Sequence, residues 1–177
     1  MQLSTLSSPT YHHKDRMPRP SRLKPRTHAV RMLYELLQTD HDVASVMERH
    51  IAQPVVNEQD EAVTPVALAE SQQAFIRTLL QLSLNQRLNH DALIMELAPN
   101  VPIDAMPLLQ RAVLYVAMSE LRYMTAEQGR GDTGVVVNAA VEIARAYVGD
   151  TAARFVNGVL ASVTLRFPDS RENASDL

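Results

Sequence analysis

The segment from Gln110 to Met124, QRAVLYVAMSELRYM, is apolar around most of its circumference when it is read as a helix. A helix with so few polar positions is normally buried at the centre of a bundle, because it offers no broad face to water. Its polar side chains recur at helical spacing and form one narrow line, which consists of Arg111, Tyr115, Ser119 and Arg122. We expect this segment to be the central helix of the fold and the line to be its only outlet to solvent.

Two further helices are predicted near the C-terminal end of the chain. Residues that recur at intervals of three and four give each helix an apolar stripe. The stripes are Val136, Ala140, Ile143 and Tyr147 in the first helix and Ala152, Val156, Val159 and Val163 in the second. Gly149 is expected to end the first helix, and Asp150 or Thr151 to cap the second. Phe155 lies at the edge of the second stripe, where its ring is either part of the core or a platform for a ligand.

The rest of the chain favours helices too, because no segment shows the strict alternation of a strand. Helices are predicted over residues 26–38, 42–51, 71–98, 107–124, 135–148 and 150–166, with a short helical turn at 103–106. We therefore predict an all-α fold.

Composition divides the chain into one helical domain and three polar segments. Residues 1–21 are rich in proline, serine and threonine and are predicted to be a disordered arm. Residues 53–70 contain two prolines, four acids and no basic side chain, as expected of an acidic linker or insertion. Residues 168–177 form a polar tail, also predicted to be disordered. The helical domain then spans residues 22–167.

Charge is distributed unevenly along the chain. Residues 1–31 hold seven lysine and arginine side chains against a single acid, Asp15, which gives this segment a charge of +6. The whole chain carries −3, so the remainder carries −9. A basic arm on an acidic body suits a polyanionic partner on one side only. The alternative interpretation is a merely solvated, disordered tail.

Several classes of site have no support in the sequence. There are no cysteines, so a disulfide framework and a thiolate metal site are both excluded. The histidines show no metal-ligand spacing with acids, and neither Glu142 with Asp150 nor Glu35 with Asp40 makes a convincing acid and base pair. We predict no enzymatic activity, no cofactor and no metal. No apolar run is long enough to span a membrane, and the N-terminal residues lack the apolar core of a signal peptide, so we expect a cytoplasmic protein.

A glycine pattern at residues 129–136 matches a phosphate-binding loop only superficially. Gly129, Gly131, Gly134 and Val136 fit G-x-G-x-x-G-x-V. The pattern follows a predicted helix instead of a strand, and no lysine lies downstream to hold phosphates. A flexible inserted loop is the better interpretation.

Three motifs together resemble one known family. QRAVLYVAMSEL, VNAAVEIARAYVGD and FVNGVL, in this order, are similar to the C-terminal half of NusB transcription antitermination factors, and RTHAVRMLYELL at residues 26–37 resembles their first helix. The resemblance covers roughly residues 22–167. It implies a double helical bundle of about seven helices with a basic N-terminal arm.

The resemblance also implies a function. NusB proteins bind the boxA element of nascent ribosomal RNA, together with the ribosomal protein NusE, within an antitermination complex on RNA polymerase. Single-stranded RNA is usually read by aromatic or guanidinium planes that stack on bases, with basic side chains at the phosphates. Carried over position by position, the family's RNA contacts fall on Arg22, Lys24, Arg26, Tyr34, Arg111, Arg154 and Phe155.

Each of these residues has a plain structural alternative. Phe155 would ordinarily be core, Tyr34 would close the core with its hydroxyl in water, and Arg111 would pair with Glu142 or a helix terminus.

The chain also departs from the family pattern. It has Gly134 where a lysine is usual, Ala139 where an acid is usual, and Tyr115 and Ser119 where arginine and tyrosine are common. These departures, with the acidic segment, leave open a NusB-like helical adaptor or homodimer without strong RNA binding. A third alternative is an RNA methyltransferase with a NusB-like domain, but its cysteine nucleophile has no counterpart here.

Overall fold

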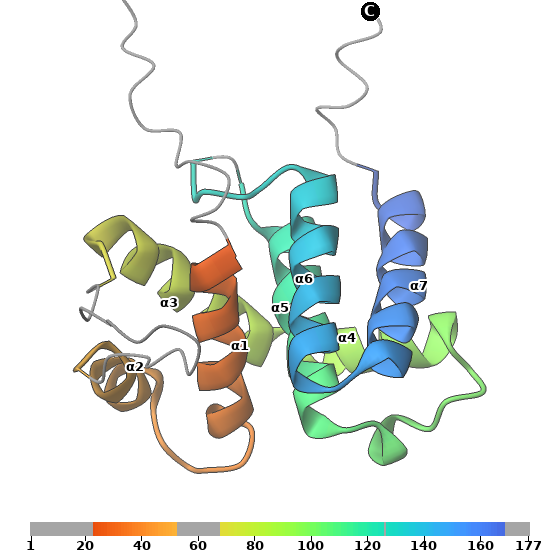
Figure 1. Ribbon diagram of the computed structural model, residues 1–177, viewed down its shortest axis with the longest axis horizontal. Coiled ribbons are helices and arrows are strands. Elements are labelled where there is room, and N and C mark those ends of the chain that lie inside the picture. Colours follow the sequence, from red (N-terminus) through yellow and green to blue (C-terminus); the bar gives the residue numbers. More distant parts are fainter. Residues whose placement is uncertain (1–22, 53–67, 126, 169–177) are drawn as a thin grey trace, which may run out of the picture.

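Helix α5 (Leu108–Tyr123) is the centre of the fold, as its sequence predicts. In the computed structural model, which describes residues 23–52, 68–125 and 127–168, it packs against α1 (Leu23–Leu36), α3 (Glu70–Asn85), α6 (Thr133–Tyr147) and α7 (Asp150–Arg166). Every residue from Ala112 to Leu121 is buried. The all-round apolar character of the segment therefore reflects contact with helices on several sides (Figure 1).

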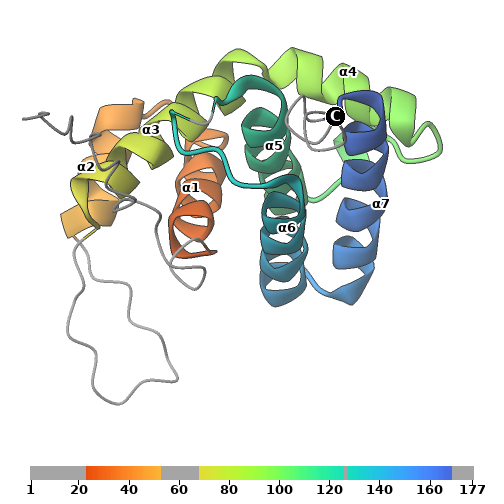
Figure 2. The ribbon, with the colours of Figure 1, turned by 90° about the horizontal axis from the view of Figure 1, so that it is seen from above.

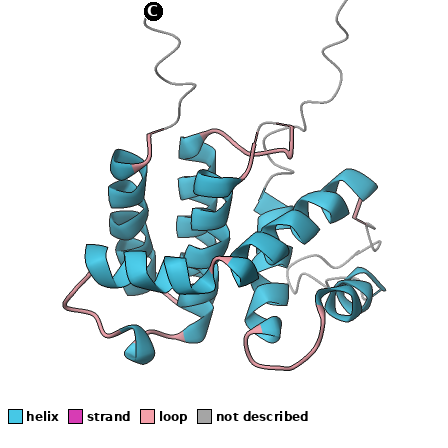
Figure 3. Cartoon of the chain, turned by 180° about the vertical axis from the view of Figure 1, so that it is seen from behind, coloured by secondary structure: helices cyan, strands magenta, loops and turns pink. Residues whose placement is uncertain are grey.

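The remaining elements complete two bundles that share α5. On one side α1 and α3 pack with α2 (Val43–Ala52), and on the other α6 and α7 pack with α5 and α4 (Arg87–Leu97) (Figures 1 and 2). A 3-10 turn, η2 (Ile103–Ala105), precedes α5, as predicted. All regular structure in the described ranges is helical (Figure 3), which confirms the all-α double bundle. None of these helices is long and apolar enough to cross a membrane.

The predicted arm, and most of the tail and of the acidic segment, lie outside the described residues. These are residues 1–21, 169–177 and 53–67.

The single helix predicted over residues 71–98 is wrong, because α3 and α4 are separated at Gln86. Its backbone leaves the helical region at φ −99° and ψ 9°, and its N–H donates to the carbonyls of Leu82 and Leu84. The break turns α4 across the ends of α5 and α7 (Figure 2). No glycine or proline marks the position, so the sequence carried no local signal of the break.

The polar line on α5 was expected to be an outlet to solvent, and that prediction is wrong for its two middle residues, whereas Arg111 and Arg122 at its ends are partly exposed. Tyr115 and Ser119 have no exposed surface, because α3 and α4 cover them. The Ser119 hydroxyl accepts a hydrogen bond from Ser83 Oγ at 3.1 Å and lies 2.9 Å from His90 Nε2. Burial, with the charge of Arg122, lowers the pKa of His90 to about 4, so this histidine is neutral at pH 7. The line is an internal polar seam between α5 and its neighbours.

The junction of α6 and α7 agrees with the sequence prediction except for the cap of α7 and one residue of the apolar stripes. Gly149 ends α6 with a positive φ of 123°, and its N–H donates to the Ala144 carbonyl. Gly149 itself is the N-cap of α7 and no side chain caps that helix, so the predicted cap at Asp150 or Thr151 is wrong. Both stripes are buried except for Tyr147, which is 50% exposed.

Candidate functional site

The start of α1 contributes one accessible cation and one buried cation. Lys24 is exposed, whereas Arg26, two residues later, is only 3% exposed. The third basic residue expected here, Arg22, lies just outside the described residues. Lys24 and Arg26, at the start of the first helix, therefore have different surroundings.

Arg26 forms a buried ion pair with Glu120 of α5. Its Nε donates to Glu120 Oε2 at 2.7 Å, its Nη2 donates to the other carboxylate oxygen, and Glu120 has no exposed surface. The guanidinium also lies 5.3 Å from the centroid of the Phe75 ring. In this arrangement Arg26 joins α1 to α3 and α5 and does not reach solvent.

The glycine-rich loop closes over this ion pair. The backbone N–H of Gly131 donates to Glu120 Oε1 at 2.8 Å. A Cβ atom at Gly131 would lie 2.7 Å from Arg26 Nη2 and 3.2 Å from Glu120 Oε1, so only glycine fits there without a shift. Gly131 is buried, so the predicted loop packs on the ion pair at this residue.

Arg111 opens α5 in a second polar cluster. Its Nη2 lies 3.3 Å from both carboxylate oxygens of Asp91 and donates to the Tyr115 hydroxyl at 2.9 Å. The hydroxyl in turn donates to Asp91. The partner is thus Asp91 of α4 and not the Glu142 that the sequence suggested.

Burial and charge shift the pKa values in this cluster. Burial raises the pKa of Tyr115 to about 12, and its hydrogen bond to Asp91 acts in the same direction. For Arg111, burial alone would lower the pKa, but the Tyr115 hydrogen bond and the Asp91 charge outweigh it and raise the pKa. Tyr115 therefore remains a neutral donor, and Arg111 remains charged.

The start of α7 places an aromatic ring beside an exposed cation. Phe155 is half-buried and packs against the core, while Arg154 is exposed and donates to the Thr151 hydroxyl at 3.3 Å. One part of the Phe155 side chain is thus packed and another reaches solvent. Tyr34 on α1 is likewise half-buried against the core.

The site residues are spread over the surface instead of lining one pocket. In Figure 1, the first turn of α1 is the upper end of that helix, the first turn of α7 is the lower end of its helix, and α5 and α6 lie between the two helices. Tyr34 follows Lys24 by ten residues, roughly 15 Å along the helix axis. Such an arrangement suits an extended ligand more than a small molecule.

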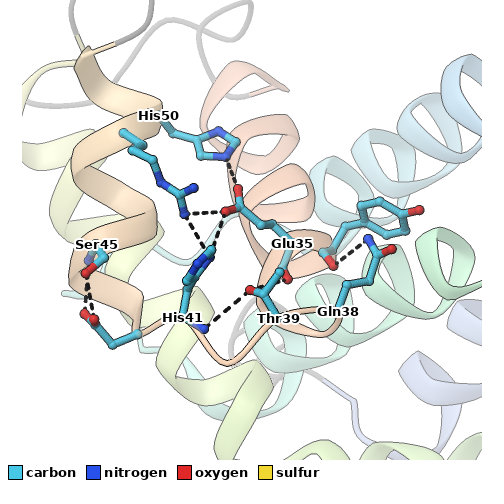
Figure 4. Close-up of polar contacts among 9 residues, drawn as sticks. Glu35, Gln38, Thr39, His41, Ser45 and His50 are labelled. Carbon is cyan, nitrogen blue, oxygen red and sulfur yellow. Dashed lines mark hydrogen bonds and ion pairs between the residues drawn. The ribbon is translucent and has the colours of Figure 1, made fainter.

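A polar cluster at the junction of α1 and α2 was not predicted as a unit. Glu35 accepts a hydrogen bond from Arg49, lies 2.9 Å from His50 Nε2 and lies 3.4 Å from His41 Nδ1 (Figure 4). The hydrogen bond with His50 lowers the pKa of Glu35, and the Arg49 charge adds to this. These contacts attach α2 to α1. The described residues contain no group of three or more His, Asp or Glu side chains placed to hold a metal ion.

Comparison with known proteins gives one consistent result. Residues 23–165 match the sequence profile of the NusB family. The transcription antitermination protein NusB of Chloroflexus aggregans is 36% identical over 147 residues, which cover 83% of this chain and 89% of that protein. The protein of the same name from a Roseiflexus species is 31% identical over 151 residues, 85% of this chain and 96% of that protein.

Solved structures agree in fold. T. maritima NusB superimposes with a TM-score of 0.68 at 18% identity, over 90% of this chain and 99% of that one. NusB in a crystal structure with NusE and double-stranded RNA gives a TM-score of 0.64 at 18% identity, over 84% of this chain and 98% of that one. The family profile spans all the helices described above apart from the last residue of α7. The chain belongs to the NusB family.

Proposed function

We propose that this protein is an RNA-binding transcription antitermination factor that binds boxA RNA of ribosomal RNA transcripts together with the ribosomal protein NusE. The observation that carries the proposal is the family match, which extends over residues 23–165. The relatives described above are named transcription antitermination proteins, and a structural neighbour was crystallised with NusE and RNA. The proposed role is binding in the cytoplasm, within an RNA polymerase complex, without catalysis.

The proposed interface uses residues that reach solvent, together with Arg22, which lies outside the described residues. Phe155 would stack on a base, with Arg154 and Lys24 at phosphates and Arg22 extending the basic edge. Tyr34 would offer a second aromatic contact. These five residues and Arg111 lie within residues 22–167, the proposed functional domain.

Arg111 and Arg26 differ in what they can contribute. Arg111 keeps part of its surface, with a side chain 19% exposed, so it can approach a phosphate while it stays paired with Asp91. Arg26 is only 3% exposed and holds α1 on α5, so we assign it a positioning role in place of direct contact.

The alternative function is a helical protein adaptor or homodimer without strong RNA binding. The ion pairs of Arg26 and Arg111 favour this alternative, because Glu120 and Asp91 already neutralise the charges of the two arginines. Gly134, where the family usually has a lysine, removes a further cation.

One titration separates the two functions. A labelled boxA-like RNA is titrated with the protein, with and without NusE, and binding is measured by fluorescence anisotropy. A scrambled RNA of equal length is the control, and two salt concentrations are compared. The antitermination factor prefers boxA, binds more tightly with NusE, and loses affinity steeply as salt rises. Equal, weak binding of both RNAs under every condition would favour the adaptor.

A further inference from the structure

Arg122 lies between two aromatic rings where the ends of α5 and α7 meet. Its Cζ atom is 4.9 Å from the centroid of the Tyr123 ring and 4.4 Å from that of Phe167. Arg166 approaches the same Phe167 ring, at 5.7 Å. Two guanidinium groups and two aromatic rings thus lie within cation–π distance of one another at this corner of the molecule. We call these four residues the C-terminal stack.

The charge of Arg122 has no carboxylate partner among the described residues. Arg166 is different, because it pairs with Glu96 of α4. Arg122 Nη1 is also buried without a hydrogen-bond acceptor. His90, whose ring centroid lies 5.9 Å from that of Tyr123, is neutral at pH 7 and adds no charge. The stack therefore carries a positive charge and lacks the acceptor that an arginine normally has.

Phe167 presents an aromatic surface at the same place. Its side chain is 37% exposed, which is unusual for phenylalanine. Its backbone N–H donates to the Val163 carbonyl at 2.9 Å, so Phe167 is attached to the end of α7 as its C-cap. An exposed ring beside an unneutralised guanidinium group is the combination by which proteins bind single-stranded nucleic acids, with a base on the ring and a phosphate at the cation.

We propose that the C-terminal stack is a contact site for one nucleotide of single-stranded RNA, with the base on Phe167 and the phosphate at Arg122. The proposal rests on the RNA-binding function proposed above and extends it. Phe155 on α7 and Phe167 at its C-cap are twelve residues apart, roughly 18 Å along the helix axis. The stack would therefore hold RNA that runs beyond the segment bound at Phe155.

Two variants test the two halves of the site. Arg122→Gln removes the charge and keeps a polar side chain, and Phe167→Leu removes the ring and keeps apolar packing. Arg145→Gln and Tyr147→Leu are matched controls, because both residues are exposed on α6. Each variant is titrated with a short boxA-like RNA, with the same RNA extended by unstructured nucleotides, and with an oligoglutamate peptide, at several salt concentrations. Circular dichroism and thermal melting report folding.

For the extended RNA, Phe167→Leu is expected to lower affinity roughly fivefold or more without changing the salt dependence. Arg122→Gln is expected to lower affinity and to reduce the slope of log K against log salt by about 0.7, the loss of one phosphate contact. The short RNA should bind both variants as it binds the unaltered protein. A purely structural role of the stack would not change the salt slope.

Other outcomes overturn the proposal. The proposal is wrong if both variants bind the extended RNA as the unaltered protein does. It is also wrong if the variants lose only oligoglutamate binding, because the stack would then bind an acidic protein partner. If boxA is not preferred over scrambled RNA but both variants still weaken binding of the extended strand, the antitermination function fails and the contact site stands. If the unaltered protein binds neither RNA, both fail.

Discussion

Arg26 and Glu120, which are 94 residues apart in the chain, form a buried ion pair that fixes the start of α1 to the second half of α5. Side-chain exposure is 4% for Arg26 and zero for Glu120, and Gly131 donates a third hydrogen bond to the carboxylate. A buried charge is tolerated only when its partner and hydrogen bonds are present. The pair therefore adds a polar link between α1 and α5 to the apolar packing of α1.

Arg26→Ala should destabilise the fold, because it leaves the Glu120 carboxylate buried without its partner. The expected loss in the free energy of unfolding is about 3–5 kcal/mol, measured by urea denaturation. Arg145→Ala is the matched control, since its ion pair with Asp150 is exposed and contributes about 1 kcal/mol or less. Unchanged stability with a large loss of RNA affinity would instead make Arg26 a direct RNA contact.

Gly131→Ala should also destabilise the protein. The added methyl group would lie 2.7 Å from Arg26 Nη2, so either the loop or the ion pair must move. We expect a cost of about 1–3 kcal/mol in the free energy of unfolding. Gly134→Ala is the control, because no atom lies within 4 Å of its added Cβ and alanine favours helix. Equal stability of the two variants would show that the loop is not docked on the pair.

The sequence predicts the central helix and the α6 and α7 pair well, because their signals are local. Apolar residues at intervals of three and four define a buried face, and Gly149 has the backbone freedom that a helix end requires. These features depend on residues within one or two turns of each other. Family motifs in the same segments then indicate which fold the helices build.

The remaining features depend on contacts between distant segments. The break at Gln86 has no glycine or proline, and Tyr115 and Ser119 on the polar line of α5 are buried because α3 and α4 pack over them. In the candidate site, Lys24 is exposed and Arg26 is buried, but both are basic residues, so residue type does not predict which of them is buried. Only the position of Glu120 distinguishes them, and that position is a property of the packed helices.

His90 should make stability depend on pH in the mildly acidic range. Burial lowers its folded-state pKa from 6.5 to about 4, so the unfolded chain binds this proton more readily. The stabilising effect is complete above pH 6.5 and is lost progressively as the pH falls toward 4. The loss should reach about 3 kcal/mol in the free energy of unfolding at most.

Urea denaturation between pH 7.5 and pH 4 checks this prediction, with His90→Gln as the test variant. That variant should show a flatter dependence of the free energy of unfolding on pH than the unaltered protein. His41→Gln is the control, because His41 is exposed. If the unaltered protein and His90→Gln show identical pH dependence, His90 is not the source of the loss of stability at low pH.

Phe155→Ala should weaken boxA RNA binding while the helix content stays the same. Base stacking on an aromatic ring contributes about 1–3 kcal/mol, so a loss of roughly fivefold or more in affinity is expected by anisotropy. Phe155 also packs against the core, so Phe155→Leu is needed to keep the apolar contact while removing the ring. Tyr147→Ala controls for the loss of an exposed aromatic residue elsewhere on the protein. If Phe155→Ala unfolds the domain and Phe155→Leu binds RNA normally, Phe155 belongs to the core alone and the RNA surface must be sought on other residues.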